Sequence, residues 1–315
     1  MTGAALRPGE TPGIGYAVAR AAALRGHAVA LLDVSARGLA GAEAALRAEF
    51  APPAGDVPPA GIALPVGDAP PGAAALAAGV ALSLAVGLPA GDAPRPSGTP
   101  PAAGLDCRVA RADIGDAAAV TAAVAALSAA GPITAVVTAA ALTRTARSFV
   151  PFLDLEPADI DAAVAVNVSG LFNVVRAVVP GFLAARRGVV ITIGSAAASY
   201  PASGLALYAM TKAAVASVTR SLAAEYGSRG IHVQGFAPGP VRTAVYARTP
   251  EHYRRSTAEN SVTGRPAEPG EIADEIVAAI EHPQPLLAGH MVPLDGGLSP
   301  FGVHRATEPR SPQGA

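Results

Sequence analysis

The sequence predicts an α/β fold in which helices cover both faces of a doubly wound parallel sheet. Apolar segments of strand length alternate with segments of helical composition along most of the chain. The strand segments are apolar at nearly every position, which is typical of parallel strands buried on both faces. With 51% hydrophobic and 15% charged residues among 315, the chain has enough apolar material to bury such a sheet.

Charge and cysteine content exclude several kinds of partner. Lys and Arg number 23 against 24 Asp and Glu, a formal net charge of -1, which argues against nucleic acid as the main partner. The single cysteine, Cys107, cannot form an internal disulfide, and the six histidines show no metal-ligand spacing, so we expect no metal. Because residues 1–10 lack a signal-peptide pattern, we expect a cytoplasmic protein.

The first predicted elements follow the first glycines of the chain. Residues 16–25 have helical composition, residues 28–33 form an apolar run that ends in Asp33, and residues 36–50 are again helical. This order predicts a helix, a buried strand and a second helix.

Residues 51–104 interrupt the alternation. Pro or Gly occupies 21 of these 54 positions, against 64 of 315 in the whole chain, a density that blocks long helices and strands. The apolar stretch at 72–88 is short for a bilayer span and contains three glycines, so we expect an Ala-rich surface element and no membrane insertion. The other residues suit a single domain over 1–300 with a mobile tail at 301–315.

After residue 104 the alternation resumes. Residues 109–113 and 133–139 are predicted strands, and residues 116–130 between them are a predicted helix capped by Asp116. Residues 157–187 are a long helical region with a kink or break expected near Gly170.

The remaining elements keep the same order. Residues 189–194 are a predicted strand, residues 205–226 a helix and residues 231–237 a strand. A last helix at 269–281 and a last strand at 290–294 complete the predicted sheet.

The sharpest chemical signal is Tyr208 followed four residues later by Lys212 on a predicted helix. This spacing places the phenol and the ammonium on one helix face. Acid/base work at neutral pH requires the tyrosine pKa to fall by ~3 units, or ~4 kcal/mol. A positive charge ~4 Å away at an effective dielectric of ~20 supplies about that much. Alone, the pair is a weak motif because many helices carry it by chance.

Two further polar residues strengthen the signal. Ser195 follows the strand 189–194 at its carboxyl end, where open parallel sheets bind ligands. Its hydroxyl either holds a substrate oxygen or caps a helix. Asn167 lies inside a predicted helix, where its short side chain either bonds the local backbone or serves a site.

These residues together resemble the short-chain dehydrogenase/reductase family. The motifs that carry the resemblance are Thr2-Gly3 with Gly13-Ile14-Gly15, Asn167, Ser195, Tyr208 and Lys212, Pro238-Gly239, and Asp295-Gly296-Gly297. The Ile-Thr-Ile-Gly segment before Ser195 is similar to 3-oxoacyl-[acyl carrier protein] reductases. The resemblance implies a Rossmann-like fold and an NAD(P)-dependent oxidoreductase that moves hydride between nicotinamide and a small carbonyl or alcohol substrate.

The resemblance also implies roles for individual residues. Tyr208 would transfer the proton, Lys212 would lower its pKa and bind the nicotinamide ribose, Ser195 would orient the substrate oxygen, and Asn167 would hold a relay water. The helical regions 157–187 and 205–226 would pair with a second subunit, giving a homodimer or homotetramer.

The candidate cofactor site begins at the first glycines. Glycines let the backbone approach a pyrophosphate, and the following helix start offers free amides. Asp33 is placed to accept hydrogen bonds from adenosine ribose hydroxyls and to repel a 2′-phosphate, which favours NAD over NADP; otherwise it caps the helix near Ser35. The cofactor-binding candidates are Gly3, Gly13, Ile14, Gly15, Asp33, Asp113 at the adenine, Ala140, Tyr208, Lys212, Pro238 and Gly239.

Three departures from the family pattern affect the cofactor site and the sheet. Six extra residues, 6–11, lie between Gly3 and Gly13, and Glu10 among them would repel a pyrophosphate. Thr138-Ala139-Ala140-Ala141 stands where the family usually has Asn-Asn-Ala-Gly. The apolar strand expected before Thr2 is missing. Either the run 80–86 fills its place in the sheet, or the true start codon lies upstream.

The substrate side permits more than one interpretation. Residues 241–264 resemble the family's substrate lid, and their charged and aromatic residues suit an anionic substrate or a solvated loop. We expect a ketoreductase or alcohol dehydrogenase. The alternative is a noncatalytic relative with weakened cofactor binding, and a further rival is an epimerase or dehydratase, which typically has a longer carboxyl-terminal domain. The lid residues concerned are Arg242, Arg248, His252, Tyr253, Arg254 and Arg255.

Overall fold

The computed structural model of the chain describes residues 13–50, 83–87, 105–141, 149–200 and 202–298. Within these residues, seven strands form one sheet in the order β3-β1-β2-β4-β5-β6-β7. The six strands predicted from the sequence are confirmed to within two residues at each end. They are β1 (Ala28–Asp33), β3 (Cys107–Arg111), β4 (Ala135–Thr138), β5 (Gly188–Ile193), β6 (Ile231–Pro238) and β7 (Met291–Leu294).

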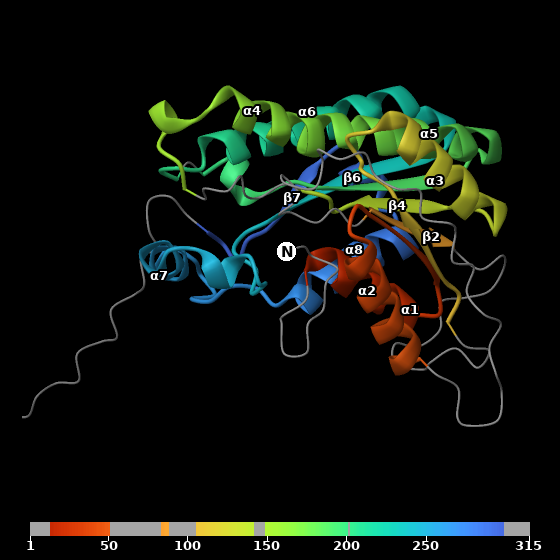
Figure 1. Cartoon of the computed structure of the whole chain (residues 1–315), viewed down its shortest axis with the longest axis horizontal. Helices are drawn as coiled ribbons and strands as arrows, with labels where there is room; N and C mark the ends of the chain where they lie inside the picture. Colours follow the sequence, from red (N-terminus) through yellow and green to blue (C-terminus); the bar gives the residue numbers. More distant parts are fainter. Residues whose placement is uncertain (1–12, 51–82, 88–104, 142–148, 201, 299–315) are drawn as a thin grey trace, which may run out of the picture.

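Helices cover both faces of the sheet (Figure 1). One layer holds α1 (Ile14–Leu24), α2 (Ala36–Glu49) and α8 (Pro269–Glu281), and the other holds α3 (Ala117–Ala129), α5 (Gly170–Ala185) and α6 (Ala206–Tyr226). Successive side chains of β1 enter two different cores: Val29 and Leu31 pack on the first side, and Ala30 and Leu32 on the second. The predicted doubly wound α/β architecture is therefore confirmed.

The central strand β2 (Ser83–Gly87) comes from the Pro/Gly-rich insert. Ala85 lies opposite Ala30 of β1 and Val136 of β4, so β2 fills the slot between them. The hypothesis that the run 80–86 replaces the missing strand is confirmed for Ser83–Val86, and the expectation of a surface element is wrong for these residues. Residues 80–82 and the rest of the insert lie outside the described residues.

β2 corrects the expectation of an all-parallel sheet, because it runs antiparallel to both neighbours. Its last residue, Gly87, pairs with Ala28 at the sheet edge where β3 begins beside Val29. Two parallel strands need a long crossover between them, whereas the antiparallel β2 ends at the same side of the sheet at which β3 begins.

Side chains fix the starts of several helices. Asp116 accepts hydrogen bonds from the amides of Ala118 and Ala119, so the predicted cap of α3 is confirmed. Ser35 caps α2 by accepting from the amide of Gly38 at 3.0 Å. These bonds satisfy amides that the first helical turn leaves unpaired.

The long helical region is divided at the predicted place. α4 (Pro157–Val164) passes into a π-helical turn (Ala165–Ser169), and α5 begins at Gly170. A Cβ at Gly170 would lie 2.5 Å from Ile114 Cδ1, so glycine permits the close approach of α5. The stretch Pro157–Ala185 is long and apolar enough to cross a membrane by length and composition, but it belongs to the helical layer on the sheet.

Candidate active site

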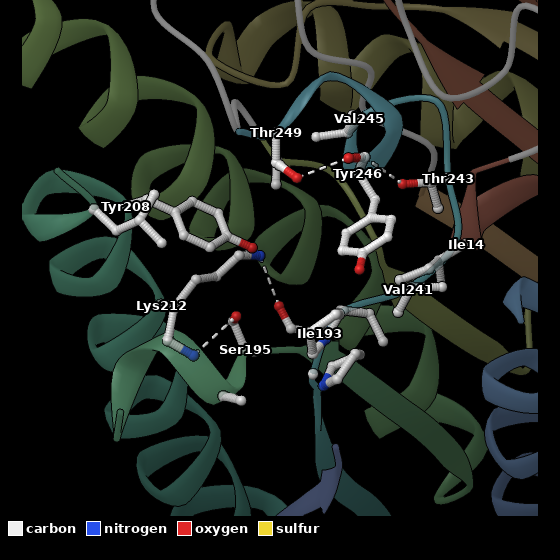
Figure 2. A pocket seen from close by; sticks show the side chains of 18 of the residues that line it. Ile14, Ile193, Ser195, Tyr208, Lys212, Val241, Thr243, Val245, Tyr246 and Thr249 are labelled. Carbon is white, nitrogen blue, oxygen red and sulfur yellow. Dashed lines mark hydrogen bonds between the residues drawn. The ribbon is translucent and has the colours of Figure 1, made fainter. Parts of the chain in front are cut away.

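A cavity of about 270 Å³ opens at the carboxyl ends of β5 and β6. Ser195 follows β5, and Pro238 and Gly239 end β6 and begin the next loop. Figure 2 shows Ser195, Tyr208 and Lys212 together in this cavity, with Ile14 of α1 on another wall. The structure thus brings together eight of the predicted site residues: Gly13, Ile14, Gly15, Ser195, Tyr208, Lys212, Pro238 and Gly239.

Tyr208 and Lys212 project from one face of α6, as their spacing predicts. The Lys212 Nζ lies 5.8 Å from the centroid of the Tyr208 ring and donates a hydrogen bond to the Ile193 carbonyl oxygen at 2.8 Å. The Ser195 Oγ accepts a hydrogen bond from the amide of Ala197 at 3.2 Å. Ser195 therefore caps a short 3-10 helix (Ala196–Ala198), as one of the two interpretations predicts, and it also lines the cavity. Its contact with a substrate oxygen stays a prediction.

The protonation states differ from the sequence-based expectation. Burial raises the pKa of Tyr208 to about 12; a hydrogen bond with Ser195 opposes this rise and the neighbouring Tyr253 adds to it. Burial also lowers the pKa of Lys212 to about 8. The predicted fall in the Tyr208 pKa is therefore wrong in this structure, because desolvation of the phenol is the largest cause of the shift and the Lys212 ammonium is not among its causes. At neutral pH Tyr208 keeps its proton.

Asn167 lies behind the main cavity, in the π-helical turn between α4 and α5. Its Nδ2 donates to the Thr211 Oγ1 at 3.0 Å, and the Thr211 hydroxyl donates to the Tyr208 carbonyl oxygen at 2.8 Å. Asn167 and Lys212 also line a second cavity of about 10 Å³, close to the volume that one water needs. The Asn167 amide thus contacts the helix that carries Tyr208 and Lys212.

The start of α1 has the features of an anion site. Gly13 is the N-cap, and no side chain in the described residues caps this end of the helix. Free amides and the positive end of the helix dipole favour a phosphate group at this position. The glycines that form it line the same cavity as Tyr208, so this end of the site fits the pyrophosphate of a dinucleotide.

Asp33 has an unpaired oxygen that fits a hydroxyl donor. Its Oδ1 accepts from the amide of Ser35 at 2.7 Å, whereas its buried Oδ2 has no hydrogen-bond partner among the described residues. Burial raises the pKa of Asp33 to about 7. Ser35, and not Asp33, caps α2. Asp33 is fully buried and does not line the main cavity.

The other predicted cofactor contacts lie farther from the main cavity. The Asp113 Oδ1 accepts from the amide of Gly115 at 2.9 Å, in the turn after β3. Ala140 lines the smaller cavity, while its neighbours Ala139 and Ala141 line the main one. Gly3 and the insertion at residues 6–11 lie outside the described residues.

The lid residues contribute less charge to the cavity than the sequence suggested. Of the six that we singled out, Arg248 and Tyr253 line the cavity. Arg242 pairs with Glu268 at 2.6 Å, and Arg255 lies 3.9 Å from Glu259. These pairings draw one cation of the lid toward Glu268 at the start of α8 and another toward Glu259 one turn farther along its own helix.

Sequence reasoning missed several aromatic residues in the wall. Phe149 precedes Val150 in the segment after β4, Tyr200 follows β5, and Tyr246 begins a short 3-10 helix (Tyr246–Arg248). One feature of the sequence could have indicated them. Aromatic residues make up only 4% of the chain, yet several of them occur in the segments that follow the strands.

The comparison with protein families places most of the described sheet in one family. Residues 78–299 match the family model described as enoyl-(acyl carrier protein) reductase. This range includes β2 and every strand after it, together with the residues around Ser195 and Tyr208.

Individual relatives have similar names. The chain is 32% identical over 168 residues to a 3-oxoacyl-[acyl-carrier-protein] reductase of Thermotoga maritima, covering 53% of this chain and 67% of the relative. It is 33% identical over 168 residues to an acetoacetyl-CoA reductase of Allochromatium vinosum, with the same coverage. An inactive 2-(S)-hydroxypropyl-CoM dehydrogenase 2 of Xanthobacter autotrophicus is 33% identical over 196 residues, covering 60% of this chain and 83% of the relative.

Solved structures show the same fold. A 3-oxoacyl-[acyl-carrier protein] reductase from Brucella melitensis superposes with a TM-score of 0.58 at 27% identity, covering 62% of this chain and 73% of that one. A gluconate 5-dehydrogenase from Burkholderia cenocepacia, solved in complex with NADP and tartrate, has a TM-score of 0.58 at 28% identity, covering 62% and 76%. Another Brucella melitensis reductase structure, with bound NAD, has a TM-score of 0.56 at 27% identity, covering 62% and 72%.

Proposed function

The chain belongs to the short-chain dehydrogenase/reductase family of nicotinamide-dependent oxidoreductases, and we propose that it reduces a small carbonyl substrate at Ser195, Tyr208 and Lys212. The observation that carries this proposal is the meeting of these three side chains with the uncapped start of α1 in one cavity. The hydroxyls of Ser195 and Tyr208 can then bind the substrate oxygen while the start of α1 binds the cofactor pyrophosphate, with substrate and cofactor in the same cavity.

The residues of the chain divide the work of reduction. A bound nicotinamide would supply the hydride. The Ser195 hydroxyl holds the carbonyl oxygen, and the Tyr208 hydroxyl gives its proton to that oxygen as negative charge develops. Because burial raises the pKa of Tyr208 to about 12, this side chain rests in the protonated form that reduction requires. Alcohol oxidation requires the phenolate, so the arrangement favours the reductive direction.

Replacing Tyr208 by Phe tests this role directly. Tyr208→Phe keeps the ring and removes the proton donor, so we expect loss of turnover with unchanged nucleotide binding. Tyr226→Phe is the matched control, because Tyr226 ends the same helix outside the cavity. Residual activity of Tyr208→Phe above about a tenth of the wild-type rate would contradict the role, since general acid catalysis contributes at least ~100-fold.

The proposed cofactor is NAD in preference to NADP. The unpaired Oδ2 of Asp33 is suited to accept from a ribose hydroxyl, and its carboxylate would repel a 2′-phosphate. One similar structure was solved with NADP and another with NAD, so the relatives do not decide between the two cofactors. Titrating NADH and NADPH separately by their fluorescence decides the preference; tighter binding of NADPH would contradict it.

A noncatalytic relative with weakened cofactor binding is the second candidate. Two observations favour it: the six-residue insertion at 6–11 and the inactive enzyme among the relatives. The same titration separates the two candidates. If neither nucleotide binds at millimolar concentration, only the noncatalytic function remains.

The proposed assembly is a cytoplasmic homodimer or homotetramer. Apolar side chains are exposed on the helical layer that carries α4, α5 and α6, where a second subunit would cover them. Light scattering of the wild type and of Phe172→Glu measures this; a monomeric wild type would contradict it. The exposed residues on these helices are Ile160, Phe172 and Met210, and Phe152 and Leu153 are exposed in the 3-10 helix that precedes α4.

A further inference from the structure

We propose that Phe149, Tyr246 and Tyr253 form an aromatic wall that selects carbonyl substrates bearing a flat aromatic group. This inference deepens the proposed function and rests on it, because it assigns the substrate class of the same cavity. The aromatic wall is defined here by these three residues, which come from the segment after β4, the 3-10 helix Tyr246–Arg248 and α7 (Glu251–Glu259).

Aromatic side chains are concentrated in this cavity to an unusual degree. The chain has six tyrosines, seven phenylalanines and no tryptophan among 315 residues. Four of the six tyrosines line the cavity, and Phe149 lies beside them. Ligand cavities are commonly apolar, but a chain this poor in aromatic residues would not supply five of them to one cavity by composition alone. The four tyrosines are Tyr200, Tyr208, Tyr246 and Tyr253.

The backbone holds Phe149 in an unfavourable conformation. Its φ is 59°, in the left-handed region that residues with a side chain rarely adopt. Gly204, with φ 78°, packs against it, and a Cβ at Gly204 would lie 2.7 Å from the Phe149 Cα. A strained residue persists only where its surroundings fix it, and such residues cluster at ligand-binding sites. The position of the Phe149 ring is therefore built into the fold.

The aromatic wall lies beside the reacting hydroxyl. The rings of Phe149 and Tyr253 meet edge to face, with centroids 5.0 Å apart and an interplanar angle of 62°. Tyr253 is close enough to Tyr208 to contribute to the rise of its pKa. Figure 2 shows the Tyr208 and Tyr246 side chains entering the same space from opposite sides. A ring attached to a carbonyl held at Ser195 and Tyr208 would therefore meet aromatic edges and faces.

The cavity offers little charge for an anionic substrate. Among the described lining residues, the charged side chains are Lys212 and Arg248. The Lys212 ammonium is buried and donates to the Ile193 carbonyl oxygen, and Arg248 is an exposed residue at the end of the 3-10 helix Tyr246–Arg248. An uncharged aromatic group matches the rest of the wall better than a phosphate or carboxylate does.

Three methyl ketones with eight carbons provide the test: acetophenone, cyclohexyl methyl ketone and 2-octanone. We expect wild-type kcat/KM with NADH to favour acetophenone over the other two by about 3- to 10-fold, the range measured for aromatic pairs beyond simple burial. Phe149→Leu keeps an apolar side chain and removes the ring, so it should abolish this preference mainly through the KM for acetophenone. Phe172→Leu, on α5 outside the cavity, is the matched control, because it also removes a ring while leucine keeps an apolar side chain at the proposed subunit contact.

The two phenols are tested separately from Phe149. Tyr253→Phe should retain the preference because the ring remains, whereas Tyr253→Leu should lose it. Equal kcat/KM for the three ketones in the wild type, or an unchanged preference in Phe149→Leu, would overturn the aromatic wall while leaving the proposed reductase intact.

If the wild type turns over none of the three ketones, direct measurement of ketone binding still tests the aromatic wall. If the wild type neither turns over any of the ketones nor binds NADH or NADPH, the proposed function is refuted. Calorimetry with acetophenone and cyclohexyl methyl ketone then measures the wall itself. Tighter binding of acetophenone to the wild type than to Phe149→Leu supports it, and equal binding overturns it.

Discussion

Ala85→Pro tests whether the antiparallel strand β2 completes the sheet. Ala85 lies between Ala30 of β1 and Val136 of β4, so its amide faces one of these strands. Proline removes that amide, leaves a buried carbonyl without its donor and restricts φ, at a combined cost of about 3 kcal/mol. In a domain of this size each kcal/mol lowers Tm by about 2–4 °C, so we expect a fall of about 6–12 °C.

The assay is thermal unfolding followed by circular dichroism, with urea unfolding as the second measurement. The matched control is Ala93→Pro, which makes the same change in a Pro-rich part of the insert outside β2. The control should shift Tm by about 2 °C or less, because the sequence around Ala93 is already rich in Pro and Gly, which excludes long helices and strands. Equal Tm values for the two variants would refute the placement of β2 in the sheet.

Two further predictions follow from shifted pKa values. Because burial lowers the pKa of Lys212 to about 8, the rate of reduction should fall about tenfold per pH unit above pH ~8. Lys212→Arg should remove this fall from the pH profile of the rate. The same fall in the variant would show that Lys212 does not cause it. Burial raises the pKa of Asp33 from 3.8 to about 7, so the folded state holds this proton more tightly than the unfolded state. The free energy of unfolding should therefore fall with rising pH between about 4 and 7, relative to Asp33→Asn, by on the order of 4 kcal/mol. Urea unfolding of both proteins at several pH values measures the difference; parallel curves would show that Asp33 titrates normally.

The sequence predicted the outer strands well because each is a continuous apolar run bounded by helical segments. It also suggested that the run 80–86 enters the sheet, with an upstream start codon as the alternative, since an empty central slot would leave backbone groups of two neighbours unpaired. The direction of β2 could not be predicted. A short apolar run has the same pattern in either direction, and the choice depends on where the chain must continue, here at the start of β3.

The sequence predicted those residues of the candidate site whose place is determined by their position in a regular helix or at the end of a strand. Ser195 follows a strand, and Tyr208 and Lys212 lie four apart on a helix, so their proximity is a consequence of regular geometry. Phe149 and Tyr246 reach the cavity from irregular segments, whose path depends on tertiary packing. The direction of the Tyr208 pKa shift was also missed, because desolvation depends on atoms from many distant segments.

The direction of β2 also determines how the anion site is held. In a doubly wound sheet, the strand before the glycine turn normally leads directly into the first helix. Here β2 begins at Ser83, which pairs with Leu32 and Thr138 near the carboxyl ends of β1 and β4. The central strand therefore starts on the side of the sheet where the cavity lies and runs away from it. α1 is fixed instead by its packing against β1 and α8, through side chains that are fully buried. Most of these are alanines, which allow a close approach between the helices. The placement of the Gly13 amides at the cavity therefore depends on the fit of this helix pair, so changes at the α1–α8 contact should affect nucleotide affinity before they affect the proton transfer at Tyr208.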